Sequence, residues 1–122
     1  MAGTVVASTI NTDSGVFQTN NALTGCAKAW VQFAGNATPT INASFNVSSI
    51  TYISTGQWTV NFTTAMSASS YAVNLSQGPN SASNYSSNII ITLTTTSVNV
   101  GHYEAATFAN PSTSMFVSVF SA

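Results

Sequence analysis

The chain has 122 residues, about the length of one domain, and charged residues make up only 2% of it. Asp13, Lys28 and Glu104 are the only side chains with full charge near neutral pH. Because nucleic-acid binders and proteins on anionic membranes need clusters of Lys or Arg, this composition argues against both kinds of partner. The polar residues are mostly 19 Ser, 18 Thr and 13 Asn, while 7 Phe, 4 Tyr and 2 Trp are enough for a packed core.

The first 23 residues show no sustained hydrophobic period, and we expect them to form an N-terminal arm with one short strand near Thr4 to Ile10. From Lys28 onward, apolar and polar residues alternate as in a strand. Trp30 and Gln32 fall on one face of this strand, and Ala29, Val31 and Phe33 fall on the other. Both Trp30 and Trp58 are expected in the core.

The segment from Ile41 to Val47 alternates in the same way and predicts one half-buried strand. Residues 49–53 and 57–63 then flank a short loop that ends in Gly56. Since Gly readily adopts a positive φ, this pattern predicts a β-hairpin with a three-residue loop and a bulge.

The second half of the chain predicts four further strands, near residues 71–75, 89–94, 98–103 and 115–120. Ile89, Ile90 and Ile91 are consecutive, which suggests either burial on both faces of a strand or a contact between subunits. Short strands separated by turn residues, with no helical period, predict an all-β fold. We expect an antiparallel β-sandwich or jelly-roll-like domain over residues 24–122, preceded by the arm at residues 1–23.

Few side chains are available for catalysis. His102 and Glu104 are two positions apart, so a strand places both on one face, and we expect a solvent-facing hydrogen-bonded pair. Two ligands are too few for a metal site unless a three-fold axis supplies more. The lone Cys26 cannot form an intrachain disulfide and is expected to be buried or interfacial. We predict no catalytic, cofactor-binding or metal-binding residues, and therefore no enzyme.

A long polar loop offers the best candidates for surface contacts, because loops on a β scaffold often display binding residues. Asn80, Asn84 and Tyr85 lie in this loop, and Tyr103 is a further exposed-ring candidate for stacking on a sugar. These four residues are the predicted contact residues.

The low net charge, −1, favours self-association, so we expect a homo-oligomer. The N-terminal residues lack the basic and apolar regions of a signal peptide, and no apolar run reaches the length of a membrane span. We therefore expect synthesis in a cytoplasm without membrane insertion.

Several segments resemble a small domain of tailed-bacteriophage virion proteins, often labelled tail-fibre or structural proteins. The segments are GCAKAWVQF at 25–33, SFNVSSIT at 44–51, TGQWTVNFTTAM at 55–66 and YAV at 71–73. Residues 2–6 and 9–15 also resemble the N-terminal segment that attaches some phage fibres to the particle. The resemblance covers residues 1–75, with Gln32 where the family usually has Asn.

The resemblance implies a non-enzymatic virion component: a short tail fibre or adhesin-like protein, held to other virion proteins by its arm. Analogy with fibres implies a homotrimer, and a host-surface glycan is left open as a partner. A capsid decoration protein, either cement or head fibre, is the main alternative, and a glycan-binding module is the second. A carbohydrate-active enzyme would need Asp13 and Glu104 from different subunits.

Overall fold

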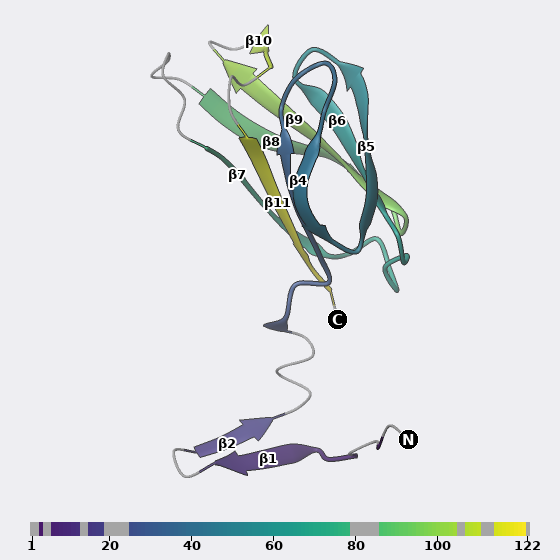
Figure 1. Cartoon of the computed structure of the whole chain (residues 1–122), viewed down its shortest axis with the longest axis vertical. Coiled ribbons are helices and arrows are strands. Elements are labelled where there is room, and N and C mark those ends of the chain that lie inside the picture. Colours follow the sequence, from purple (N-terminus) through teal and green to yellow (C-terminus); the bar gives the residue numbers. More distant parts are fainter. Residues whose placement is uncertain are drawn as a thin grey trace.

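The computed structural model describes residues 3, 6–12, 15–18, 25–78, 86–104, 107–110 and 114–121. These residues form eleven strands (Figure 1). In chain order the strands are β1 Thr9–Thr12, β2 Gly15–Gln18, β3 Ala29–Ala34, β4 Ile41–Phe45, β5 Val47–Ser54, β6 Gln57–Phe62, β7 Ala72–Gln77, β8 Ser86–Leu93, β9 Ser97–Glu104, β10 Thr107–Phe108 and β11 Ser114–Phe120.

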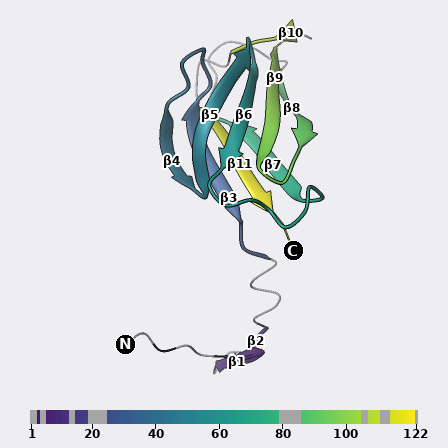
Figure 2. The same cartoon turned by 90° about the vertical axis from the view of Figure 1, so that its right-hand side faces the viewer.

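Two antiparallel sheets pack face to face, which confirms the predicted all-β sandwich (Figure 2). The first sheet has the strand order β4, β3, β11, β7. In the second sheet β5 pairs with β6 and β6 with β9, while β8 and the short β10 also pair with β9. The hairpins β3–β4, β5–β6 and β8–β9 each stay within one sheet. The chain changes sheet between β4 and β5, β6 and β7, β7 and β8, and β10 and β11.

The core lies between the sheets and is built by alternation along β3, β6, β9 and β11, which is interrupted only on β9, where Gly101 is buried between Val100 and His102. Phe33 meets Trp58 edge to face, with ring centroids 5.8 Å apart, a geometry that adds to the gain from burial. The indole Nε1 of Trp58 donates a hydrogen bond to the carbonyl of Asn36 at 3.0 Å, so the buried ring leaves no unpaired N–H. The placement of Trp58 in the core is confirmed. The buried apolar residues are Ala29, Val31, Phe33, Trp58, Val60, Phe62, Met66, Tyr71, Val98, Val100, Met115, Val117 and Val119.

The N-terminal segment forms its own two-stranded antiparallel sheet from β1 and β2. It lies apart from the sandwich in both views (Figures 1 and 2). The strand predicted near Thr4 to Ile10 overlaps β1 only at Thr9 and Ile10, because residues 6–8 are not in a strand, and the second strand, β2, was not predicted. Thr4 itself lies outside the described residues, and β1 starts at Thr9.

The predicted continuous strand from Ile41 to Val47 is also wrong, because the backbone turns at Asn46. This residue has a φ of 54°, a left-handed conformation that Asn tolerates better than most residues. β4 ends in one sheet at Phe45 and β5 begins in the other at Val47. A bulge opposite Gln32 and Phe33 further shifts the register of β4, so its apolar residues do not share one face.

The predicted hairpin is confirmed as β5 and β6, with a bulge near its end and a φ of 71° at Gly56. Its loop has two residues, Thr55 and Gly56, and not the predicted three, because Ser54 belongs to β5 and pairs with Gln57. The three consecutive isoleucines lie on β8, which pairs with β9 alone. Ile90 is 44% exposed and Ile91 39% exposed. Burial on both faces is therefore wrong for them, and the contact between subunits stays a prediction.

Candidate functional site

The outer face of the β4-β3-β11-β7 sheet carries four aromatic side chains, which we call the aromatic face: Trp30, Phe45, Phe116 and Phe120. Trp30 is 40% exposed and Phe45 is 53% exposed. Trp30 pairs across the strands with Phe45 on one side and with Ser118 on the other. Directly opposed residues in a sheet have Cβ atoms about 5 Å apart, so Trp30 and Phe45 form one continuous apolar surface.

The exposure of Trp30 corrects its predicted place in the core. Its neighbours Ala29 and Val31 are buried, and because successive side chains on a strand point to opposite faces, Trp30 must point away from the core. On β11 the same rule sends Phe116 and Phe120 outward, since Met115, Val117 and Val119 are buried. The sequence contains a pattern that could have predicted this face. Aromatic residues on β3 and β11 alternate with a second set of apolar residues, and only one of the two sets can face the core.

The outer face of the other sheet has a different chemistry, dominated by hydroxyl and amide groups. The amide nitrogen of Asn61 donates hydrogen bonds at 3.0 Å to the hydroxyls of Ser49 and Thr51 on the neighbouring strand. An apolar group covers one end of this sheet, where Tyr103 stacks on Phe108 with ring centroids 4.0 Å apart. Polar groups on this face thus form hydrogen bonds with one another.

Among the predicted contact residues, only Tyr103 falls within the described part of the chain. Its ring is partly buried and stacked on Phe108, so one of its faces is already occupied. Asn80, Asn84 and Tyr85 lie outside the described residues. The grouping of the four predicted contact residues therefore stays a prediction.

His102 is fully buried, which corrects the predicted solvent-facing pair. It follows Val98 and Val100 on the core face of β9. Its Nδ1 lies 3.0 Å from Oδ1 of Asn88 and its Nε2 lies 3.4 Å from Oε1 of Glu104, so the predicted contact with Glu104 is present. The Glu104 side chain is 28% exposed. Both ring nitrogens of His102 thus have a polar partner, and His102 and Glu104 form a partly buried polar contact.

Other chemical groups of the described residues are dispersed. Cys26 is exposed, so the expectation of a buried thiol is wrong, while an interfacial role stays a prediction. The described residues contain no group of three His, Cys, Asp or Glu side chains placed to hold a metal ion. In the part of the chain that the structure describes, no helix has the length and hydropathy of a membrane span.

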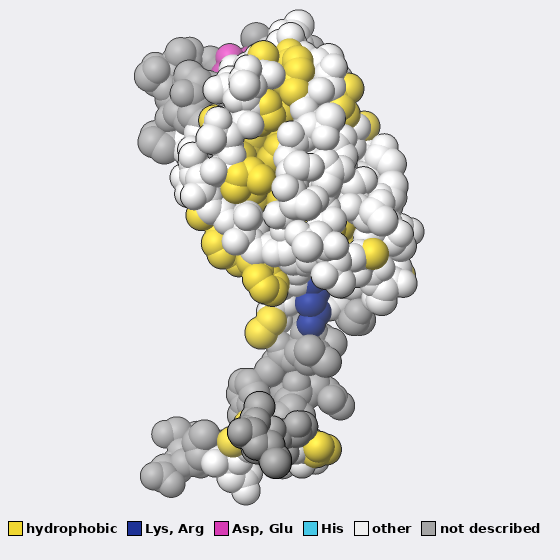
Figure 3. Space-filling model, turned by 45° about the vertical axis from the view of Figure 1, so that its right-hand side comes forward, with side chains coloured by type: hydrophobic (Ala, Val, Ile, Leu, Met, Phe, Trp, Pro, Cys, Tyr) yellow, Lys and Arg dark blue, Asp and Glu magenta, His cyan; other side chains and the backbone are white. Residues whose placement is uncertain are grey.

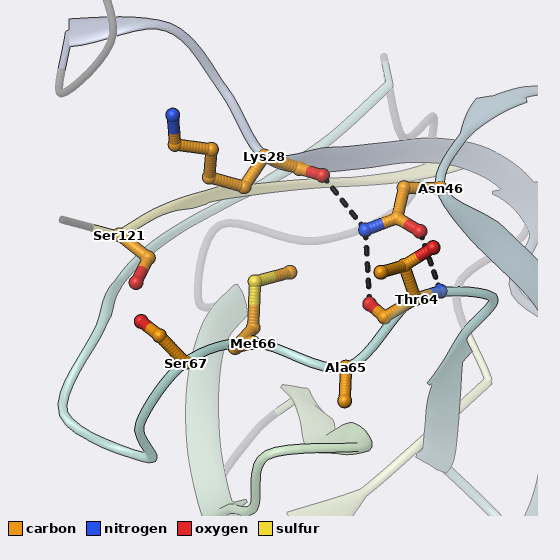
Figure 4. Close-up of a pocket in the computed structure, with 7 residues that line it drawn as sticks. All are labelled: Lys28, Asn46, Thr64, Ala65, Met66, Ser67 and Ser121. Carbon is orange, nitrogen blue, oxygen red and sulfur yellow. Dashed lines mark hydrogen bonds between the residues drawn. The ribbon is translucent and has the colours of Figure 1, made fainter.

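A shallow pocket of about 240 Å³ lies where the start of β3, the turn at Asn46 and the segment after β6 meet (Figure 4). Its lining residues are Lys28, Asn46, Thr64, Ala65, Met66, Ser67 and Ser121. The amide of Asn46 donates to the carbonyls of Lys28 at 3.0 Å and Thr64 at 3.1 Å, and accepts from the Thr64 N–H at 2.7 Å. These bonds join three chain segments, so the residues that line the pocket serve primarily to stabilise the fold at this turn.

The molecular surface is almost free of charge. One face in space-filling view is mostly uncharged polar and backbone atoms with apolar groups between them (Figure 3). The basic group lies at the base of the sandwich and the acidic group at its opposite end. Any partner of the middle of the sandwich therefore meets apolar and neutral polar groups.

A scan against protein-family models, a search of curated proteins and a search of solved structures each gave no match.

Proposed function

We propose that this chain is a structural protein of a bacteriophage particle, in the first place a short tail fibre or adhesin-like component. The observation that carries the proposal is the aromatic face, where Trp30 and Phe45 are exposed rings among neutral polar side chains of the β4-β3-β11-β7 sheet. Exposed apolar surfaces rimmed by polar residues mark contacts with other macromolecules. Such a surface suits a protein that acts by contact and has no catalytic step.

The resemblance of residues 1–75 to tailed-phage virion domains supports the particle as the setting. In this proposal residues 1–23 attach the chain to other virion proteins, and the sandwich faces outward. Neutral contacts also suit a particle that meets changing salt, because apolar burial is less sensitive to ionic strength than surface ion pairs. Fibre analogy favours a homotrimer, and a host-surface glycan is an open second partner.

Immunogold labelling of purified particles with an antibody against the sandwich tests the proposal. We expect label at the tail. Label spread over the capsid, with copies in the hundreds per particle, would support the alternative of a decoration protein and reject the fibre. Particles that carry no label and no copy of the chain by mass spectrometry would reject both virion roles.

The glycan-binding module is distinguished by deletion of residues 1–23. A fibre or decoration protein attached through its arm should be lost from particles after this deletion. Unchanged incorporation would show that the arm does not attach the chain, and would favour an independent binding module.

A further inference from the structure

The two outer faces of the sandwich use their polar side chains differently. On the side of β5 and β6, the amide nitrogen of Asn61 already donates to the hydroxyls of Ser49 and Thr51 at 3.0 Å. On the aromatic face, the polar neighbours of the rings are Ser118 and Asn74. Neither of these two side chains forms a hydrogen bond within the described part of the chain. Their hydrogen-bonding groups are therefore available to a ligand.

Strand pairing sets rings and polar groups in one row across the sheet. From β4 to β7 the row consists of Phe45, Trp30, Ser118 and Asn74. Neighbouring strands lie about 4.8 Å apart, so the row is about 14 Å long. Two rings lie at one end of it, and a hydroxyl and an amide lie at the other. The row is longer than one pyranose ring and suits a chain of sugar units.

The rings at one end of the row are accessible. Trp30 is 40% exposed and Phe45 is 53% exposed, and neither ring contacts another aromatic ring of the described residues. By contrast, the ring of Tyr103 is stacked on Phe108. A pyranose has C–H groups on its faces and hydroxyls at its edges. The negative face of an aromatic ring attracts the C–H groups, whereas hydroxyl and amide side chains bond to the hydroxyls.

The charges near this sheet favour a neutral sugar. The row contains no charged residue. Among the described residues, Glu104 lies on β9 in the other sheet, and Lys28 lies just before β3, beside the pocket (Figure 4). Acidic polymers are held by clusters of Lys or Arg, because each buried anionic group needs a cationic partner. A single Lys at the end of the strand does not supply such a cluster.

We propose that the aromatic face binds a neutral oligosaccharide along the row from Phe45 to Asn74. Sugar rings stack on Trp30 and Phe45, and sugar hydroxyls bond to the side chains of Ser118 and Asn74. The inference rests on the proposed function, because it assigns that function's open glycan partner to one surface and one chemical class. The binding of one copy is weak, since the face is flat, and many copies on a particle strengthen it.

Fluorescence quenching of the whole chain tests the contact with Trp30. Trp58 is fully buried, so acrylamide quenches mainly the emission of Trp30. The probes are neutral hexasaccharides of glucose, galactose, mannose and N-acetylglucosamine, each added at rising concentration. At least one of them should lower the quenching of Trp30 in a saturable way, because a stacked sugar shields the indole from acrylamide.

Substitutions test the row, with the affinity for the hexasaccharide that protects Trp30 measured by calorimetry. Trp30→Ala should bind about tenfold more weakly, because it removes the stacked apolar area, whereas Trp30→Tyr keeps a ring and should bind within about threefold of the unmodified chain. Asn74→Ala should bind about fivefold more weakly, since it removes a hydrogen-bonding amide. Ile53→Ala and Asn61→Ala are the matched controls on the other sheet, and both should bind like the unmodified chain.

Acidic oligosaccharides test the chemical class. Oligomers of galacturonic acid and of sialic acid should bind more weakly than the neutral probe. Tighter binding of an acidic oligomer, lost in Lys28→Gln, would overturn the assignment to a neutral sugar.

Three further results would overturn the proposal. In the first, no neutral probe protects Trp30. In the second, Trp30→Ala binds the probe as well as Ile53→Ala does. In the third, protection of Trp30 rises with the concentration of the chain in the absence of sugar, which would mean that protein covers the face. The virion role is independent of these results, because labelling of particles tests it separately.

Discussion

Both faces of the β4-β3-β11-β7 sheet carry large apolar side chains, yet the second sheet covers only one of these faces. Along β3, Val31 and Phe33 point into the core, whereas Trp30 points outward. The second sheet covers the inner face and the described residues leave Trp30 partly exposed on the outer one. The difference shows that ring size alone does not decide burial in a sandwich: the strand's alternation and the position of the opposite sheet decide it.

Among the substitutions that test this comparison, Trp58→Ala should have the largest effect on stability, because it removes a fully buried ring from the core. We expect a loss of about 3–5 kcal/mol in the free energy of unfolding, since large-to-small core changes lose both transfer energy and packing. The contact with Phe33 and the hydrogen bond to Asn36 disappear together. Urea unfolding measures the loss, at a low protein concentration that keeps self-association out of the curve.

Trp58→Phe is the control, because it keeps an aromatic ring but removes the N–H donor. Its loss should be clearly smaller than that of the alanine variant. A change below about 1 kcal/mol for Trp58→Ala would contradict the packed core, since a cavity of this size cannot close without cost.

The turn at Asn46, where the chain passes from one sheet to the other, should give the next largest effect on stability. Asn46→Ala removes three hydrogen bonds to Lys28 and Thr64 and puts at this left-handed position a residue that tolerates the conformation less well than Asn. We expect a loss of about 2–3 kcal/mol, because each of these partly or fully exposed hydrogen bonds is worth about 0.5 kcal/mol net and the less tolerated backbone conformation costs about 1 kcal/mol more. The midpoint of urea unfolding reports it.

Asn46→Gly separates the two causes, because Gly adopts the positive φ without strain but makes no side-chain bonds. It should be destabilised less than Asn46→Ala. Equal losses would mean that the backbone conformation is not strained at this corner.

Substitution of Tyr71 should have a smaller effect on the free energy of unfolding, and this effect should depend on pH. Its hydroxyl donates to the carbonyls of Thr94 at 2.9 Å and Ser97 at 2.8 Å, and burial raises the pKa of Tyr71 above its ordinary value of 10.0. Because the folded state then favours the protonated hydroxyl, this contribution to stability is complete below pH about 10 and falls as the pH rises further. Tyr71→Phe should cost about 1–2 kcal/mol at neutral pH.

The measurement for Tyr71 is the unfolding free energy from about pH 8 to about pH 11, a range that brackets the ordinary pKa of tyrosine. The unmodified chain should lose more stability across this range than Tyr71→Phe does. Parallel curves for the two proteins would show that Tyr71 ionises equally in the folded and unfolded states.

Much of the fold followed from alternation in the sequence, because a period of two fixes both the strand and its faces. The β5 and β6 hairpin was predictable since Gly56 supplies the positive φ at its turn. The corner at Asn46 was not, because the alternating pattern continues through it and only tertiary bonds to Lys28 and Thr64 reveal the break. Asn in a polar chain is too common to mark a left-handed residue by itself.

The exposed rings of the described residues were not predicted. Sequence reasoning placed Trp30 in the core and singled out Tyr103, whereas Trp30 and Phe45 are the exposed rings there, and the polar loop lies outside the described residues. The reason is that β3 and β11 carry large apolar side chains on both faces, so the pattern does not say which face the other sheet covers. Likewise His102 was expected in solvent, although it extends the buried set of Val98 and Val100 on β9.

Trp30→Ala should change the free energy of unfolding least, and it is the counterpart on the outer face to Trp58→Ala in the core. We expect a loss below about 1 kcal/mol, because it removes a cross-strand pair with Phe45 but opens no cavity. Ile53→Ala, another exposed apolar residue, on β5, is the matched control and should behave alike. A loss for Trp30→Ala near that of Trp58→Ala, measured on the monomer, would mean that another part of the chain covers the outer face. That face would then be unavailable to a glycan.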